Sequence, residues 1–498
     1  MEADEVEQRI RVKRGGQSSS PRRKRATKSD VATPLPTAED TPPAPEVEPP
    51  PSAQGAPQPA PAPRRSPVLR PRPAPRPGAP MNGLLALTVA SLFTPFQFAT
   101  GVATVRPFDA LAAVLFMAAL THLNRMRSDR TAIELWILLP YFGWHALSAF
   151  TVSAQNGLRE TIQIAVVLLF AISLLILKDR LNVRQVGRHL LIGLFAVMLF
   201  NAAYHIAIGH TGGWKTLGDA KLSMTFLPVV LGLFLVFRPG WRLGLILWLT
   251  TGAVILLSGE RKALLVFGVL SALVYGRGRL VTMTAMLAFG AQALQLFALA
   301  TSNAYLTRQI DTLFNPPTTD LPLEALARGG TVESLSNAQR IFSLRLSEDL
   351  FSQHPLFGIG TNVYVHYVQQ MFPYAPAYLR LGIHGEFQRV TVENGLLGLG
   401  LYLAIFAVSF GRIAALIRRL PRPARRTYTL AALVLILPCL VSLSLEAAAT
   451  RSFLVLIVLS FAPDLMRRAA EMQGLLTWRP RPVRTWRVPL DDSRSSVH

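Results

Sequence analysis

The sequence predicts an all-α, polytopic membrane protein with about 12 transmembrane helices, because its composition excludes an ordinary soluble enzyme. The 498 residues are 50% hydrophobic and only 16% charged, and the mean hydropathy is +0.33. Apolar runs of spanning length recur along the chain. Cys439 lies in one of these runs and is the only cysteine, so neither a disulfide framework nor a thiolate metal site is expected.

The candidate helices alternate with short loops whose charges set an orientation. Apolar runs occur at about residues 82–100, 107–121, 131–150, 157–177, 186–208, 222–237, 242–257, 262–276, 280–300, 390–411, 428–446 and 450–466. With both ends of the chain in the cytoplasm, the inner short loops hold 17 Lys and Arg and the outer short loops only seven. Because basic loops stay on the cytoplasmic side, this bias predicts an even number of spans and two cytoplasmic termini.

The ends of the chain differ in composition from its middle. Residues 1–80 contain 19 of the 37 prolines and almost no long apolar side chains, so they are predicted to be a disordered Pro/Arg-rich cytoplasmic tail. Residues 81–466 would form the membrane domain, and residues 467–498 a basic cytoplasmic tail. The net charge of +22 resides mostly in the first tail and in short loops between apolar runs. It therefore indicates contact with membrane lipid and no nucleic-acid partner.

One connection, residues 301–389, is much longer than the others and falls on the outer face. Such a loop in a compact bundle is usually functional. Asn337 can cap a helix that runs to about Gln353. The apolar face of this helix would consist of Phe342, Leu346 and Leu350. Pro355 and the turn at Gly358 would end it, so a small helical cap on the outer membrane surface is expected.

The first candidate site is the outer turn that contains Arg261 and Lys262 between two apolar runs. Two adjacent cations on the face that the other basic residues avoid could clamp an anion, because guanidinium forms bidentate pairs with phosphate. The alternative is that Arg261 pairs with Glu260 or extends to lipid headgroups. The residue types alone leave both interpretations open.

The second candidate is Arg340, in the first part of the predicted external helix. A cation near a helix N-terminus is opposed by the helix dipole, which suggests that it is kept there for a ligand. Arg345 follows, but it can pair with Asp349 four residues later on an ordinary solvated face.

The third candidate lies where the outer loop returns to the membrane. His384 stands there in a position to accept a proton near neutral pH. Glu386, Arg389 and Glu393 follow at helical spacing, either as substrate-binding groups or as residues that neutralise one another on a helix that enters lipid. No metal-ligand spacing accompanies them. The sequence thus predicts an outward site of cations and one base, without a metal or other cofactor.

Four short segments within residues 250–405 carry a family resemblance. They are Ser258-Gly259-Glu260-Arg261, Asn337-Ala338-Gln339-Arg340, His354-Pro355-Leu356-Phe357-Gly358-Ile359-Gly360, and His384 followed by Glu393-Asn394-Gly395-Leu396-Leu397-Gly398. In this order and placement they resemble the O-antigen ligase and polymerase superfamily of bacterial inner-membrane enzymes. These enzymes join glycans made on undecaprenyl diphosphate into lipopolysaccharide or exopolysaccharide.

The resemblance implies a type C glycosyltransferase-like helical fold and an inverting, metal-independent glycosyl transfer on the periplasmic side. Arg261 and Arg340 would hold the diphosphate of the lipid-linked donor, and His384 would act on the acceptor hydroxyl. Gly385 stands where asparagine commonly follows the histidine, and Glu386 is an alternative base. The acceptor would be a glycan or the lipid A core. Fixed cations suit this reaction on physical grounds as well, because the leaving diphosphate gains negative charge in the transition state.

Two further functions fit the composition. The chain could be a transporter or flippase for a lipid-linked or anionic substrate, which paired ionisable residues at the middle of the bilayer would favour. It could also be a noncatalytic scaffold that recruits partners through its Pro/Arg-rich tail.

Overall fold

The computed structural model describes residues 79–476 with several internal gaps. The gaps are residues 95, 97, 100–103, 124–131, 208–220, 239, 259–260, 277–278, 280–281, 285, 288–289, 291–321, 329–334, 378, 381 and 446–448. The amino-terminal tail, most of the carboxyl-terminal tail, most of the ninth expected span at 280–300 and the first part of the outer loop therefore lie outside the described residues. Predictions about these segments stay predictions.

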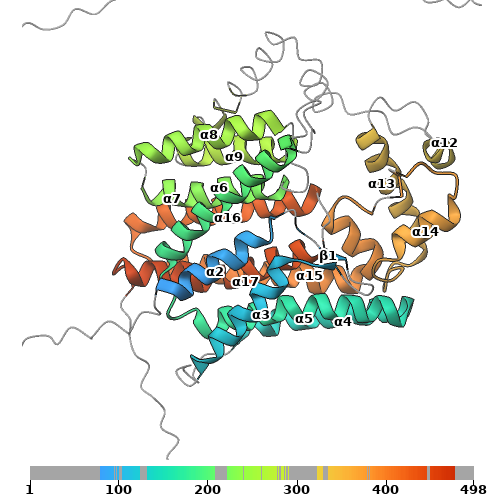
Figure 1. Ribbon diagram of the computed structural model, residues 1–498, viewed down its shortest axis with the longest axis horizontal. Helices are drawn as coiled ribbons and strands as arrows, with labels where there is room; N and C mark the ends of the chain where they lie inside the picture. Colours follow the sequence, from blue (N-terminus) through green and yellow to red (C-terminus); the bar gives the residue numbers. More distant parts are fainter. Residues whose placement is uncertain are drawn as a thin grey trace, which may run out of the picture. The chain divides into compact units, whose positions relative to one another are not determined.

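The described elements are α-helices and one short antiparallel strand pair (Figure 1). In chain order the elements before the outer loop are α2 (Ala79–Ser91), β1 (Phe98–Ala99), β2 (Thr104–Val105), α3 (Pro107–Leu120), α4 (Ile133–Val152), α5 (Ala154–Leu177), α6 (Val183–Ala207), α7 (Lys221–Phe237), α8 (Arg242–Ser258) and α9 (Arg261–Gly276). The loop contributes α12 (Leu323–Ala327), α13 (Leu335–Gln353) and α14 (Val363–Met371). The last three are α15 (Glu386–Arg419), α16 (Arg422–Leu445) and α17 (Ala449–Met472).

Five of the described helices are long and apolar enough to cross a membrane. They are Ile133–Val152, Ala154–Leu177, Val183–Asn201, Glu386–Arg419 and Arg422–Ser444. Shorter apolar helices are Pro107–Leu120, Phe226–Phe237, Arg242–Ile255 and Ala263–Gly276. The expected helical, multi-pass membrane architecture is confirmed to this extent, and the count of 12 spans stays a prediction.

The first expected span, residues 82–100, was predicted to extend too far at its carboxyl end. Instead of continuing to residue 100, α2 stops at Ser91, and the chain then forms the β1–β2 pair, in which Phe98 lies opposite Val105. Pro95 explains the early end, because proline donates no backbone hydrogen bond and keeps the preceding residue out of the helical conformation. The sequence pattern showed the apolar content of this segment and missed its break.

The membrane helices share one large buried cluster of apolar side chains. It draws on α2 to α9 and α15 to α17, and its largest fully buried members include Tyr141, Phe142, Tyr402 and Phe453. Tyr141 packs edge-on against Tyr402, with ring centroids 5.1 Å apart. Helix α4 contacts α5, α15 and α17 in this cluster, and α17 also contacts α5 and α15. They form the scaffold on which the candidate site is built.

A second buried cluster holds the outer cap together. Phe342, Leu346 and Leu350 on α13 are each no more than 2% exposed, as their spacing predicted, and they pack with residues of α12 and α14. Val392 of α15 belongs to the same cluster, so the cap is attached to a membrane helix by its own core. Asn337 was expected to cap α13, and this is wrong, because the helix begins two residues earlier at Leu335.

A network of ion pairs joins four helices at the end of α15 farthest from the cap. Arg412 of α15 donates to Glu134 of α4 and to Asp464 of α17, both at 2.7 Å. Lys178, which follows α5, donates to the same Glu134 at 2.9 Å. Glu134 is fully buried, so two cations neutralise a carboxylate that lipid or protein surroundings would otherwise destabilise.

Replacing Arg412 with Ala is expected to destabilise the protein without touching the outer site. The change leaves Asp464 and buried Glu134 short of a cation, which costs about 3 kcal/mol for a buried pair. The unfolding midpoint in detergent should fall by several degrees, whereas Arg419→Ala, on the exposed end of the same helix, should leave it unchanged. Equal midpoints for the two variants would contradict this role.

Candidate functional site

His384 lies beside the external helix α13 and directly before α15. Its Nε2 atom is 2.8 Å from Oε1 of Gln339, which is 95% buried. When the amide oxygen of Gln339 accepts this bond, Nε2 carries the proton of the neutral ring and the basic lone pair resides on Nδ1. The Gln339 contact holds the orientation of the imidazole.

A second contact holds the same two helices in register. The side-chain amide of Gln388 donates to the backbone carbonyl of Ser343 at 3.0 Å and to the hydroxyl of Ser347 at 2.8 Å. Arg340 is the residue after Gln339 on α13, and its side chain is exposed. Arg340 is thus the residue next to the one that contacts His384, and its side chain lies on the exposed face of α13.

The three charged residues that follow His384 form ion pairs with one another. Arg389 forms a bidentate pair with Glu386, through Nε at 3.1 Å and a terminal nitrogen at 2.6 Å, and its other terminal nitrogen is 3.1 Å from Glu393. All three are at least 94% buried. The structure therefore favours the second of the two roles that the sequence left open. Both oxygens of Glu386 are engaged by Arg389.

Helix α15 is broken where the outer loop packs against it. Gly395 has φ 66° and ψ −169°, which interrupts the helical hydrogen bonds. The loop Pro355–Gly360 replaces them: its Ile359 and Gly360 donate to the carbonyls of Val392 and Glu393, both at 3.0 Å. In return, Leu396 and Leu397 donate to carbonyls of the loop. We call this arrangement of residues 355–360 and 392–397 the clasp.

Glycine is required on both sides of the clasp. A Cβ atom on Gly395 would overlap the backbone of Leu356, and one on Gly358, which has φ 74°, would overlap the backbone of Glu393. The two Gly-containing segments that carried the family resemblance are therefore two halves of one contact.

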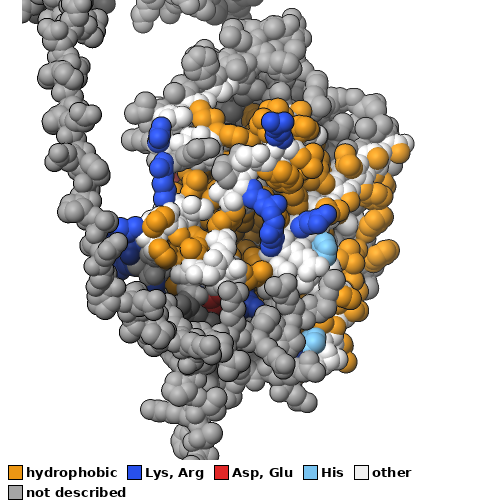
Figure 2. Space-filling view, turned by 90° about the vertical axis from the view of Figure 1, so that its left-hand side faces the viewer, with side chains coloured by type: hydrophobic (Ala, Val, Ile, Leu, Met, Phe, Trp, Pro, Cys, Tyr) orange, Lys and Arg blue, Asp and Glu red, His pale blue; other side chains and the backbone are white. Residues whose placement is uncertain are grey.

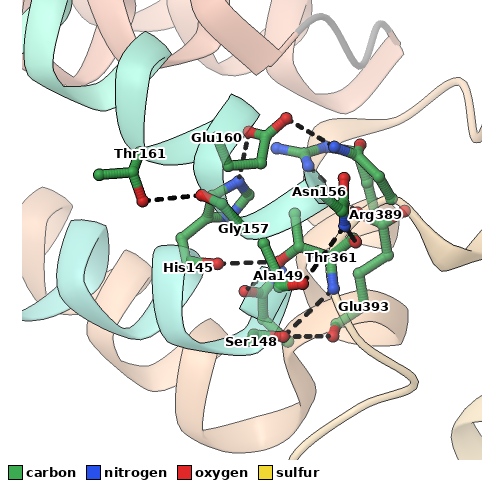
Figure 3. A network of polar contacts seen from close by, with 12 residues as sticks. His145, Ser148, Ala149, Asn156, Gly157, Glu160, Thr161, Thr361, Arg389 and Glu393 are labelled. Carbon is green, nitrogen blue, oxygen red and sulfur yellow. Dashed lines mark hydrogen bonds and ion pairs between the residues drawn. The ribbon is translucent and has the colours of Figure 1, made fainter. Parts of the chain in front are cut away.

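A buried polar network from α4 and α5 supports the clasp (Figure 3). His145 of α4 is 3.3 Å from Glu160 of α5, and the other oxygen of Glu160 accepts a hydrogen bond of 2.6 Å from Asn362. Thr361 donates through its backbone to Ser148 at 3.2 Å and through its hydroxyl to the carbonyl of His145. The network thus fixes the residues that follow the clasp loop to two membrane helices.

The glycine after His384 has a packing reason. A Cβ atom on Gly385 would lie 2.8 Å from the carbonyl oxygen of Ser444 on α16. Asparagine, which commonly follows the histidine in the resembling family, would not fit here without a shift of α16. Gln339 supplies the amide partner of His384 instead.

The remaining predicted site residues, Arg261 and Lys262, are the first two residues of α9. They follow the end of α8 at Ser258, and residues 259–260 between the two helices lie outside the described residues, so the expected turn stays a prediction. Their side chains lie outside the described part of the structure. Whether Arg261 converges with Arg340 and His384 therefore stays a prediction.

Sequence reasoning missed His145, Glu160 and Asn362. The sequence did contain a signal for His145 and Glu160, because ionisable residues inside apolar spans are costly and usually functional. Asn362 has φ 63°, which the sequence did not indicate. In the cap, burial raises the pKa of Tyr364, and the nearby charge of Glu393 raises it further, so the phenol stays protonated. Among the described residues, no group of three or more His, Cys, Asp or Glu could hold a metal ion.

Comparison with known proteins identifies the segment that contains this site. Residues 245–403, about a third of the chain, match the family model described as O-antigen ligase. The match begins in α8, includes the whole outer loop and ends in α15 beyond the clasp. No curated protein matches the chain. The resemblance that the four short segments carried is confirmed.

Proposed function

We propose that the chain transfers or polymerises a glycan carried on undecaprenyl diphosphate, because residues 245–403 match the O-antigen ligase family model and the long apolar helices suit a multi-pass bacterial membrane protein. The reaction takes place at the periplasmic side of the inner membrane, inverts the anomeric centre and uses no metal. The observation that carries the proposal is the tie between His384 and Gln339. It supports an oriented histidine as the base, at the junction of the outer cap and a membrane helix, where the residue before Arg340 is its partner.

In this mechanism Nδ1 of His384 accepts the proton of the acceptor hydroxyl while the hydroxyl oxygen attacks the anomeric carbon of the donor. The bond from that carbon to the diphosphate breaks, and undecaprenyl diphosphate leaves with the bonding electrons. Arg340 and Arg261 bind the diphosphate and stabilise the charge that develops on it, which lowers the barrier more than it favours substrate binding. Lys262 adds a third cation. The backbone N–H groups at the start of α9 also favour an anion.

Glu386, Arg389 and Glu393 act by position. As an ion-paired unit inside α15 they set the rotation of the helix segment that begins immediately after His384. The His145–Glu160 pair and the clasp hold the other end of that segment. Rigid support of this kind keeps a catalytic group within a fraction of an ångström of its working position.

The exposed apolar side chains of the clasp suit the lipid part of the donor. Leu356 and Phe357 are 60% and 61% exposed, and the neighbouring Leu396 and Leu397 of α15 are also exposed. Trp144 packs against Phe357, with ring centroids 5.8 Å apart. A polyprenyl chain or the acyl chains of the bilayer can cover these side chains, which places the site at the lipid boundary.

A strain that lacks the protein tests the function against transport. Ligase or polymerase activity predicts that the finished surface glycan disappears while the lipid-linked donor accumulates with its sugars exposed on the periplasmic side. A flippase predicts that the donor accumulates with its sugars in the cytoplasm. Restoration by the wild-type chain but not by His384→Ala supports the enzyme. Normal surface glycan in the deletion strain would overturn both functions.

Gln339 should control the pH range of activity if it fixes the tautomer of His384. In Gln339→Glu, a carboxylate beside the ring stabilises the imidazolium. The neutral base is then reached only at higher pH, so the acid limb of the pH–rate profile moves upward. In Gln339→Leu the acid limb of the pH–rate profile should stay where it is, because no carboxylate is added. The value of kcat should fall, because the ring of His384 loses its hydrogen-bond partner. A uniform loss in both variants with an unchanged profile would mean that Gln339 only packs.

A further inference from the structure

A cavity of about 370 Å³ lies at the end of the bundle away from the cap, between α7, α9 and α16. Its lining is Leu235, Val274, Tyr275, Gly276, Arg279, Thr282 and Arg426. It begins where α9 ends, and α9 has 16 residues, so about 24 Å separates it from Arg261 at the start of that helix. The cavity is therefore no part of the proposed glycan site, and its volume is typical of a ligand pocket.

The polar lining is cationic. Arg279 and Arg426 enter the cavity from separate segments, and none of the described residues that line it is acidic. Backbone contacts fix Arg279: its N–H donates to the carbonyl of Gly276 at 3.0 Å, and its carbonyl accepts from Met283 at 2.9 Å. A Cβ atom on Gly276 would crowd Met283, so glycine permits this close turn.

One more feature indicates a bound anion. Tyr275 lines the cavity, and its hydroxyl oxygen is buried without a hydrogen-bond partner among the described residues. A buried hydroxyl of this kind costs free energy unless a ligand or water completes it.

The other walls are apolar, from Leu235, Val274 and the Tyr275 ring. Figure 2 shows the side of the molecule that lies at the left in Figure 1, where Lys and Arg side chains have hydrophobic side chains between them. The charge bias of the loops predicts that this end, with Arg238, Arg242, Arg418 and Arg419, faces the cytoplasm. A ligand with a phosphate group and an apolar body therefore fits the cavity.

We propose that this cavity binds the phosphate headgroup of an anionic phospholipid of the inner leaflet. Arg279, Arg426 and the hydroxyl of Tyr275 contact the phosphate, and the acyl chains leave along the apolar wall. Basic pockets between membrane helices on the cytoplasmic side recognise lipid headgroups in this manner. The site is independent of the proposed glycan transfer, because it uses different residues at the other end of the bundle.

The test is lipid binding by the full-length protein in detergent, measured by native mass spectrometry during titration with phosphatidylglycerol. The double variant Arg279→Gln, Arg426→Gln should bind about 25-fold more weakly, at roughly fivefold for each arginine. Tyr275→Phe removes only the hydroxyl and should weaken binding about tenfold. The matched control is Arg418→Gln, Arg419→Gln, which removes the same charge from exposed positions of the same end and should change binding less than twofold.

Three results would overturn the proposal. Equal losses in the two double variants would mean general electrostatic attraction. If Tyr275→Phe and the double variant Arg279→Gln, Arg426→Gln each bound the lipid with wild-type affinity, the cavity would hold no headgroup. Displacement of the lipid by millimolar inorganic phosphate would mean that the ligand is a free phosphate compound. The unfolding midpoint in lipid-free detergent checks folding, and Tyr275→Phe keeps the test decisive if the double variant folds poorly.

Discussion

Replacement of His384 or Arg340 by Ala is expected to reduce kcat for glycan transfer about 10²- to 10³-fold, the usual effect of removing one donor that acts in the transition state. His384→Ala removes the base that Gln339 orients. Arg340→Ala removes a charge that the leaving diphosphate needs, and Arg340→Lys should recover little, because an ammonium group cannot reproduce the bidentate fork. The measurement is the steady-state rate of the purified protein with a lipid-diphosphate glycan.

Arg345 provides the matched control for this experiment. It lies on the same helix as Arg340 and is exposed, but it is farther from the His384–Gln339 contact by more than one turn. Arg345→Ala should retain nearly full activity. Near-normal rates for both Arg340→Ala and His384→Ala, or a loss in Arg345→Ala as large as theirs, would show that the site has been assigned to the wrong residues.

Gly395→Ala should have a comparably large effect by a different route. Its φ of 66° disfavours any residue with a side chain, and the added methyl group would overlap the backbone of Leu356. Strain and overlap together cost about 3 kcal/mol. The clasp should open, which releases the segment behind His384, so both the unfolding midpoint and the transfer rate should fall.

Gly400, five residues farther along α15, is the control. A Cβ atom there meets nothing within 4 Å, and alanine is the better helix former by about 1 kcal/mol. Gly400→Ala should therefore keep or raise the unfolding midpoint and leave transfer unchanged. If Gly395→Ala behaved like Gly400→Ala, the hydrogen bonds of the clasp would not be what holds the two segments together.

Local patterns predicted much of this fold. Apolar runs located most of the described helices, and the spacing of Phe342, Leu346 and Leu350 gave the buried face of α13. The spacing of Glu386, Arg389 and Glu393 at three and four residues also contained their mutual ion pairs as one of two options. In each case the information is carried by residues less than three turns apart, where helical geometry alone decides which side chains meet.

The same reasoning could not predict contacts between residues that are far apart in the sequence. Asn362 and Glu160 are 202 positions apart, and Trp144 donates to the carbonyl of Asn394 across 250 positions. Hydrophobic periodicity shows which face of a helix is buried but not which other helix covers it. The break at Gly395 was hidden for a related reason, because an apolar run reads as one span even where another segment replaces its internal hydrogen bonds.

The most direct test of the central claim is to follow both products of one turnover. Purified protein is incubated in vesicles with a donor labelled with ³²P in the diphosphate and ¹³C at the anomeric carbon, with EDTA present. The account predicts one undecaprenyl diphosphate released per glycan transferred, inversion at the labelled carbon, and no effect of EDTA. Retention of configuration, release of a monophosphate, loss of transfer in EDTA with rescue by a divalent cation, or movement of intact donor across the bilayer without bond cleavage would contradict it.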